Sequence, residues 1–165
     1  LDDYAKSVRI TSDGGFIMLG TTTLNNSTAL QTDMYLVKTD NQGNLSWSNK
    51  FGSDSTNQEG NCVQQTSDNG FILVGSTTDA NPGNLNPKGT KDILLIKTDV
   101  SGFLLWNQYS GGKKADMGNY VQQKADGGYI IIGSTESFSD LGQDNSNIII
   151  IFSSNNDCAL FKVNF

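Results

Sequence analysis

The sequence predicts an all-β fold made of three four-stranded antiparallel sheets, and an internal repeat is the main reason. The aromatic residue that follows a glycine-rich turn recurs at Phe16, Phe71 and Tyr129, which are 55 and 58 residues apart. Composition agrees, because 18 of the 165 residues are glycine and only 17% are charged. Short apolar segments joined by polar, glycine-rich turns are typical of β-structure and not of helical bundles.

Each copy of the repeat reads as four strands. In the first copy, a short alternating segment ends at the turn Ser12-Asp13-Gly14-Gly15, where glycine accepts the positive φ of a tight hairpin. A loop then separates the second strand from the third, and a turn at 40–44 leads into the fourth. The predicted strands are 7–11, 16–22, 34–39 and 45–51 in copy one, 62–66, 71–77, 93–98 and 104–109 in copy two, and 120–124, 129–135, 148–153 and 159–165 in copy three.

Several of these strands are continuously apolar instead of alternating, among them Ile72-Leu73-Val74 and Ile130-Ile131-Ile132. A strand that is apolar on both faces must be covered on both faces. Sheets stacked in this way predict three blades of a β-propeller in one domain, 1–165, with blades at about 4–52, 60–111 and 118–165. Propellers close with about 4–8 blades, so we expect a partial propeller or a segment of a larger one.

An aromatic residue on the fourth strand of each copy is predicted to hold neighbouring blades together. Trp47 and Trp106 each follow a Lys-Thr-Asp turn segment, and Phe161 stands at the same position in copy three. A large flat indole with one N–H donor suits a contact across the gap to the next blade, with a hydrogen bond to a backbone carbonyl there. Ordinary core packing is the alternative, and both interpretations make these residues structural and not catalytic.

The ordered motifs carry a family resemblance. Asp13-Gly14-Gly15 before an aromatic residue, an apolar triplet, and Lys38-Thr39-Asp40 ahead of Trp47 together resemble the propeller repeats of secreted and surface proteins of Bacteroidetes, which are often exported by type IX secretion. Similarity to quinoprotein-type propeller repeats is more distant. The resemblance implies the fold and an extracellular or cell-surface location, but it assigns no activity. Copy three departs from the pattern at Phe152-Ser153-Ser154 and at Asp157, which we expect at a C-terminal blade.

Composition also argues against some classes of function. The net charge of −6 and the lack of a basic cluster argue against a nucleic-acid partner. The longest apolar run, Ile148 to Phe152, is too short to span a membrane. The chain has no histidine, which removes the usual nucleophilic triads and the commonest metal ligand. Cys62 and Cys158 are predicted to be free thiols, with a mutual disulfide as the alternative.

The variable loops are the predicted binding region. They fall at 23–32, 78–91 and 136–146, with crossovers at 52–61 and 110–119, and all lie on the rim opposite the short repeated turns. Their polar residues suit a protein or a glycan. Calcium held by Asp79, Asp92 or Asp140 stays an open alternative, although no calcium-loop spacing is present. The predicted binding-rim residues are Asn26, Asp54, Asp79, Asn81, Asn84, Asp140 and Asp144.

The sequence therefore predicts a non-catalytic extracellular scaffold or protein-interaction module without a cofactor. Its expected partners are another protein, further propeller blades or a symmetry mate that covers the open blade faces. The alternative is a glycan-binding module or a fragment of a glycosidase or quinoprotein enzyme whose site lies in further blades. For a glycosidase, the formal carboxylate pairs are Asp54 with Glu59 and Asp140 with Asp144.

Overall fold

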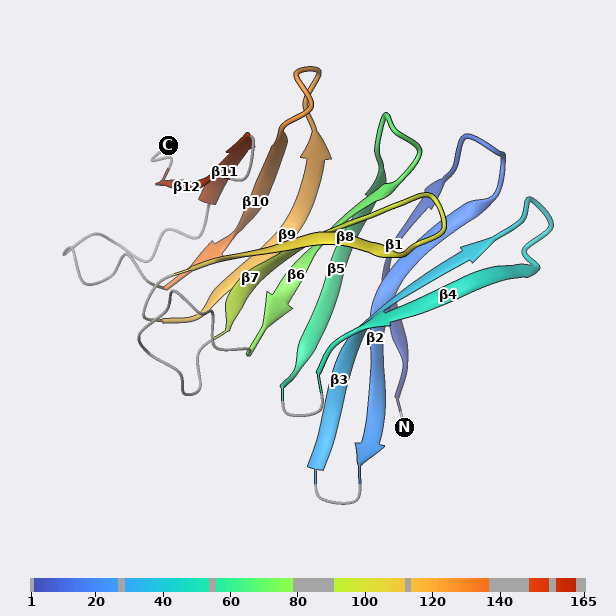
Figure 1. The fold of residues 1–165 in the computed structure, drawn as a ribbon. Coiled ribbons are helices and arrows are strands. Elements are labelled where there is room, and N and C mark those ends of the chain that lie inside the picture. Colours follow the sequence, from blue (N-terminus) through green and yellow to red (C-terminus); the bar gives the residue numbers. More distant parts are fainter. Residues whose placement is uncertain are drawn as a thin grey trace.

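The computed structural model describes residues 2–26, 29–53, 56–78, 91–111, 114–136, 149–154 and 157–162. Over these residues the protein is all-β, with twelve strands and no helix. The strands form three four-stranded sheets, each of consecutive strands in antiparallel order (Figure 1). We refer to them as the first sheet (β1–β4), the middle sheet (β5–β8) and the third sheet (β9–β12).

The strand boundaries follow the repeat. The first sheet contains β1 (Tyr4–Ile10), β2 (Phe16–Asn26), β3 (Ala29–Thr39) and β4 (Leu45–Phe51). The middle sheet contains β5 (Gln58–Gln65), β6 (Phe71–Thr77), β7 (Asp92–Thr98) and β8 (Leu104–Ser110). The third sheet contains β9 (Asp116–Gln123), β10 (Tyr129–Thr135), β11 (Ile149–Ser154) and β12 (Asp157–Lys162).

The turn between the third and fourth strands has the predicted chemistry. The Oδ1 atom of Asp40 accepts hydrogen bonds from the backbone N–H groups of Gln42, at 2.9 Å, and Asn44, at 2.8 Å. Gly43 has a φ of 87°, a conformation that side chains disfavour. Asp99 and Gly102 repeat this arrangement in the middle sheet. The local sequence therefore determines these turns.

The predicted loop 23–32 is wrong over most of its length. β2 and β3 continue the ladder well past Thr22, with Thr23 opposite Thr32 and Asn25 opposite Leu30. Threonine is a good strand former because its branched side chain fits the pleated surface. The polar character of this segment indicated a loop, whereas its threonines and leucines extend the hairpin. Asn26 accordingly lies in β2 and not in a loop.

The first strands of the sheets also begin earlier than predicted. β5 starts at Gln58 instead of Cys62, and β9 starts at Asp116 instead of Tyr120. A register shift lies between Gly60 and Cys62, so a bulge interrupts the pairing at a glycine. These polar, glycine-containing residues give no apolar alternation, which is why they were assigned to the crossovers.

Burial distinguishes the middle sheet from its neighbours. Every residue of β6 and β7 is buried, as the continuous apolar runs predict. In the third sheet, Ile131 is buried while Ile132 is exposed. The first sheet behaves similarly, because Ile17 and Leu19 are buried and Met18 between them is half-buried. The middle sheet is therefore covered on both faces by this chain, and each outer sheet on one face.

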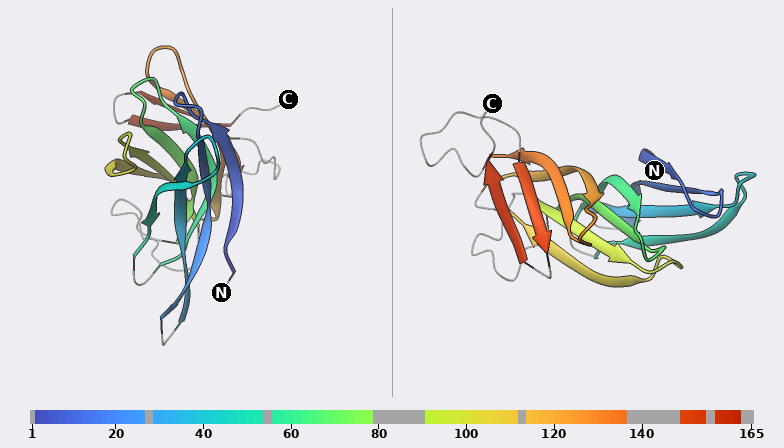
Figure 2. Two further views of the ribbon diagram at one scale, coloured as in Figure 1. Left: turned by 90° about the vertical axis from the view of Figure 1, so that its right-hand side faces the viewer. Right: turned by 90° about the horizontal axis from the view of Figure 1, so that it is seen from above.

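Two apolar interfaces join the three sheets, which follow one another in chain order (Figure 2). The first-to-middle interface packs Ile17, Leu19, Met34 and Leu36 against Val63, Phe71, Leu73, Leu94 and Ile96. The middle-to-third interface packs Cys62, Ile72, Val74, Ile93 and Leu95 against Val121, Tyr129 and Ile131.

Within the middle sheet, truncating a leucine of β6 should lower the stability far more than truncating one of β8. Leu73 is fully buried, so Leu73→Ala should lower the free energy of unfolding by about 2–5 kcal/mol. Leu105 in β8 is 56% exposed, so Leu105→Ala should change it by less than about 0.5 kcal/mol. Urea unfolding followed by circular dichroism measures both values, and equal costs would contradict the stacked arrangement.

Candidate functional site: the interfaces between sheets

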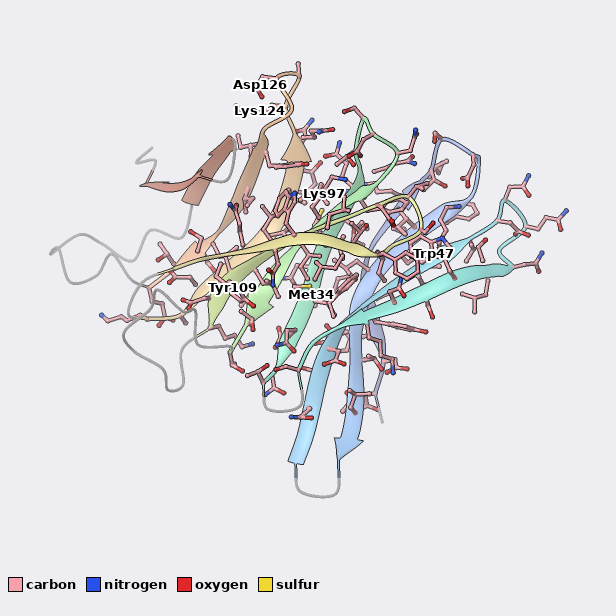
Figure 3. The ribbon with its side chains drawn as sticks, viewed as in Figure 1. Met34, Trp47, Lys97, Tyr109, Lys124 and Asp126 are labelled. Atoms are coloured by element: carbon pink, nitrogen blue, oxygen red, sulfur yellow. The ribbon has the colours of Figure 1, made fainter. Side chains whose placement is uncertain are left out.

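The two tryptophans lie at the two interfaces. The Trp47 ring contacts the Phe71 ring of the middle sheet edge-on, with centroids 5.8 Å apart (Figure 3 labels Trp47). The Trp106 ring contacts the Tyr129 ring of the third sheet with centroids 5.9 Å apart. Both contacts join the fourth strand of one sheet to the second strand of the next. Their contribution to stability remains a prediction. Phe161 lies in β12, and its side chain is outside the described residues.

The predicted hydrogen bond of the indoles is wrong. Among the described residues, neither Trp47 nor Trp106 donates a hydrogen bond from its ring nitrogen to the next sheet. Asn49 makes the hydrogen bond to the next sheet instead: its Nδ2 atom donates to the backbone carbonyl of Gly102 at 3.0 Å. A Cβ atom at Gly102 would collide with the Trp47 ring and the Asn49 amide. The glycine thus serves the interface as well as the turn.

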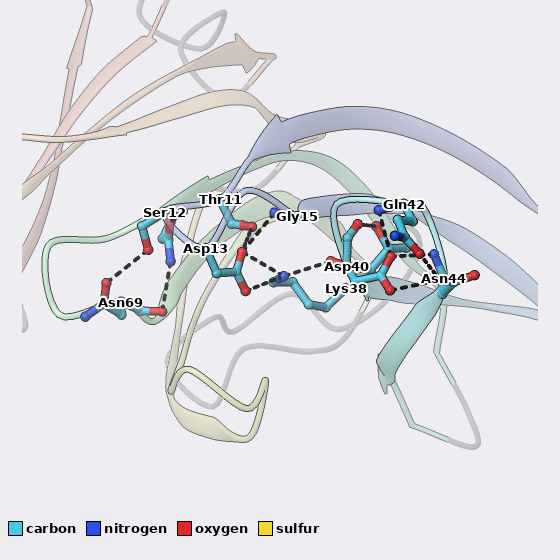
Figure 4. A network of polar contacts seen from close by, with 11 residues as sticks. Thr11, Ser12, Asp13, Gly15, Lys38, Asp40, Gln42, Asn44 and Asn69 are labelled. Carbon is cyan, nitrogen blue, oxygen red and sulfur yellow. Dashed lines mark hydrogen bonds and ion pairs between the residues drawn. The ribbon is translucent and has the colours of Figure 1, made fainter.

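A buried lysine links the two turns of the first sheet (Figure 4). The Nζ atom of Lys38 is 2.8 Å from Oδ2 of Asp13 and donates to the backbone carbonyl of Thr39, also at 2.8 Å. The Oδ1 atom of Asp13 also accepts hydrogen bonds from the Thr11 hydroxyl, at 2.5 Å, and from the Gly15 N–H, at 3.0 Å. The lysine therefore holds the turn between β1 and β2 beside the start of the turn between β3 and β4.

The middle sheet repeats the same network, and the third sheet alters it. Lys97 pairs with Asp68 at 3.0 Å and donates to the carbonyl of Thr98. Copy three has Phe152 at the position of these lysines, and its turn carboxylate, Asp126, pairs with Lys124 at 2.8 Å. The lysine has moved from the third strand to the residue that precedes the turn. This network was missed, although the loss of one lysine and the gain of another are visible in the sequence.

In each of the three sheets, the lysine that pairs with the turn carboxylate helps to lower the pKa of that carboxylate. Hydrogen bonds from Lys38, Thr11 and the Gly15 N–H hold the pKa of Asp13 far below its ordinary value. Burial raises the pKa of Asp68, but hydrogen bonds from Thr66, Lys97 and the Gly70 N–H outweigh it and bring the pKa to about 2. Hydrogen bonds from Lys124 and the Gly128 N–H lower the pKa of Asp126. All three carboxylates are consequently ionised at neutral pH.

Polar contacts also connect the first strands of the three sheets. Lys6 donates to Oδ1 of Asn61 at 2.9 Å, and Nδ2 of Asn61 donates to the carbonyl of Gly118 at 2.8 Å. These contacts run from β1 through β5 to β9. The first turns of neighbouring sheets are also linked by hydrogen bonds. The side-chain oxygen of Gln65 accepts from the backbone N–H of Ser12 at 2.8 Å, and that of Gln123 accepts from the backbone N–H of Ser67 at 2.9 Å.

Of the candidate catalytic and calcium-binding carboxylates, Glu59 and Asp92 belong to the described residues. Glu59 lies 2.5 Å from Nζ of Lys91 and 3.9 Å from Nζ of Lys6. Asp92 is buried at the start of β7, and a Cβ atom at Gly111 would collide with its carboxylate. No group of three or more metal-ligating side chains occurs in the described part of the chain. The residues brought together here are thus those of sheet packing.

Most predicted binding-rim residues cannot be placed. The side chain of Asn26 lies outside the described residues, as do Asp54, Asp79, Asn81, Asn84, Asp140 and Asp144. Cys62 is a buried free thiol, as predicted, while the side chain of Cys158 is not among those described.

A cleft of about 370 Å³ lies along the outer edge of the first-to-middle interface. Amide and phenol groups from both sheets line it, alongside apolar side chains: Asn49, Gln58, Asn107, Tyr109, Leu94 and Phe103. The strands that supply the tryptophans therefore leave a recess whose lining is mainly apolar and includes several amide groups.

Comparison with known proteins gives no identification, since no protein-family profile and no curated protein matches this sequence. Within the described ranges, no helix is long and apolar enough to cross a membrane.

Removing the indole of Trp47 should weaken the first-to-middle interface. The side chain is half-buried against Phe71, so we expect Trp47→Ala to cost about 3 kcal/mol of unfolding free energy, at the lower end for large aromatics. Trp47→Phe introduces the residue that copy three carries and should cost much less. Thermal and urea unfolding measure both, and an unchanged stability in Trp47→Ala would show that the contact contributes nothing.

Removing only the carboxylate of the turn ion pair should lower the free energy of unfolding more than removing both charged partners. Asp68→Asn leaves the buried Lys97 ammonium without its carboxylate and should cost roughly 1–2 kcal/mol at pH 7. The double variant Asp68→Asn/Lys97→Met removes the buried charge as well and should be more stable than the single variant. A double variant that is equally or less stable would contradict this assignment.

The same pair predicts a pH dependence with a definite sign. The pKa of Asp68 is lowered on folding from its ordinary 3.8 to about 2. Its stabilisation is therefore complete above the higher value and disappears as the pH falls from about 4 towards about 2. Unfolding measured across this window should show a shallower decline in Asp68→Asn than in the unaltered protein. Parallel curves would show that Asp68 does not titrate between the two states.

Proposed function

We propose that this chain is part of a β-propeller and serves as a non-catalytic extracellular scaffold or protein-interaction module. In this proposal each sheet is one blade, β1, β5 and β9 lie nearest the propeller axis, and the tryptophans of β4 and β8 lie on the outer side. Further blades, another protein or a second copy of this chain cover the open faces of the first and third sheets.

The observation that carries the propeller assignment is the complete burial of β6 and β7 between two neighbouring sheets. Small four-stranded sheets that are sandwiched face to face by their own repeats are the defining packing of propellers. Two further observations support it. Each sheet is a meander of consecutive strands, and the first strands of all three sheets contact one another through Lys6, Asn61 and Gly118.

The scaffold role is supported by what the charged side chains do. Lys38, Lys97 and Asp68 stabilise turns, while Glu59 pairs with Lys6 of the first sheet and with Lys91 of its own sheet. Side chains engaged in this way maintain the shape of the sheets, which suits a surface that other molecules recognise. The extracellular location is proposed from the sequence resemblance alone.

Zero-length crosslinking tests the propeller arrangement. A carbodiimide should couple Lys6 of the first sheet to Glu59 of the middle sheet, because their charged groups lie 3.9 Å apart. Mass spectrometry should also find the Lys91–Glu59 crosslink within the middle sheet, which serves as the internal standard. Recovery of the standard without Lys6–Glu59 would show that the innermost strands do not lie side by side.

Activity measurements test the non-catalytic assignment. The purified chain should release no reducing sugar from a panel of polysaccharides and should not reduce a dye in the presence of a quinone cofactor and alcohols. Turnover in either assay, lost on changing a carboxylate such as Asp92, would replace the scaffold proposal with an enzymatic one.

A further inference from the structure

Among the described residues, the first and third sheets each leave one apolar face uncovered. We define the head face as the open side of the first sheet, where Val8 is 54% and Ile10 is 75% exposed. Its further members are half-buried: Phe16, Met18, Tyr35 and Val37. The tail face is the open side of the third sheet, where Ile132 is 43% and Tyr120 is 42% exposed and Ile130 is half-buried.

The head face is equivalent by repeat to surfaces that are already covered. Phe16 corresponds to Phe71, which receives Trp47, and to Tyr129, which receives Trp106. Met18 corresponds to Leu73, which is fully buried against the first sheet. The head face thus presents the accepting half of an interface that the molecule forms twice.

The tail face is equivalent to the inserting half. Ile130 corresponds to Ile17 and Ile72, and Ile132 corresponds to Leu19 and Val74, all four of which are buried in the two internal interfaces. One chain therefore carries both halves of a third interface, one at each end.

A hollow in the head face matches this pairing. It measures about 260 Å³ and lies beside Gly20, Met18 and Tyr35. At the corresponding places of the middle sheet, side chains of the first sheet fill the space. The Met34 side chain packs beside Gly75, and the Leu19 side chain packs beside Gly60. Gly75 corresponds to Gly20, and Gly60 corresponds to Ala5. The hollow, which both Ala5 and Gly20 line, is therefore where side chains at the positions of Leu19 and Met34 would enter, and Ile132 stands at the position of Leu19.

The turn contacts differ between the internal interfaces and the open faces. At both internal interfaces a serine N–H in the turn of one sheet donates to a glutamine of the next, Ser12 to Gln65 and Ser67 to Gln123. The tail has Ala125 at the serine position, and the head has Ile10 at the glutamine position. The Ala125 N–H can still donate, but Ile10 supplies no acceptor, so this hydrogen bond is not repeated and the two side chains at these positions are both apolar.

We propose that the third sheet of one copy packs on the first sheet of a second copy, with Ile132 inserted into the hollow beside Ala5. This inference rests on the proposed propeller, since it extends the same stacking between molecules. The contact is head-to-tail, so it either closes into a ring or continues as an open series. Two copies supply six sheets, a number within the range of about 4–8 at which propellers close. The occupant of both open faces is then this chain itself.

Complementation between two variants tests the inference. Met18→Lys places a charge on the head face only, and Ile132→Lys places one on the tail face only. Analytical ultracentrifugation should find twice the chain mass for the unaltered protein and a single-chain mass for each variant alone. A mixture of the two variants should form a one-to-one complex, because the tail of the Met18→Lys chain and the head of the Ile132→Lys chain are both intact.

Three outcomes would overturn the inference: an unaltered protein that stays monomeric up to high micromolar concentration, a variant that still dimerises alone, or a mixture that does not associate. Leu105→Lys, which alters an exposed position away from both faces, is the matched control and should dimerise normally. The Lys6–Glu59 crosslink, measured in each variant, reports the internal stacking separately. A monomer that retains this crosslink refutes the dimer and leaves the proposed propeller standing.

Discussion

Burial of the middle sheet between its two neighbours is the interaction on which the rest of the structure depends. Its strands β6 and β7 are apolar on both faces, so they are stable only where sheets of matching shape lie on each side. Apolar area removed from water contributes roughly 25 cal/mol per Å², and two sheet-on-sheet contacts supply most of it here. The turns, the tryptophans and the polar links between inner strands all serve to bring those faces together.

The polar groups specify how the sheets meet. Apolar faces alone would tolerate sliding, but Asn61 and Gln65 bind defined backbone groups on the neighbouring sheets and so set the register. The buried lysines act within a sheet instead, holding two turns at one end. In copy three the turn carboxylate Asp126 pairs with Lys124, and the third strand carries Phe152 in place of a charge.

The fold was more predictable from the sequence than the site. Turn glycines and aspartates, the repeat period and the apolar runs identify the all-β class and nearly every strand, because these are local properties of the chain. The ends of β2, β5 and β9 were misjudged, since polar residues such as Gln58 enter the ladder only through tertiary pairing. The Lys38–Asp13 pair was missed because its partners are 25 residues apart and meet only after the hairpins form.

The meander topology has a consequence for biosynthesis. Every strand pairs only with its neighbour in the sequence, so each sheet can form its backbone ladder as soon as about fifty residues have left the ribosome. Local pairing of this kind lowers the entropy that must be lost before native contacts form, and it favours folding unit by unit from the N-terminus. During synthesis, one apolar face of the middle sheet is exposed to solvent until the third sheet emerges from the ribosome. A chaperone would reduce aggregation most during that interval.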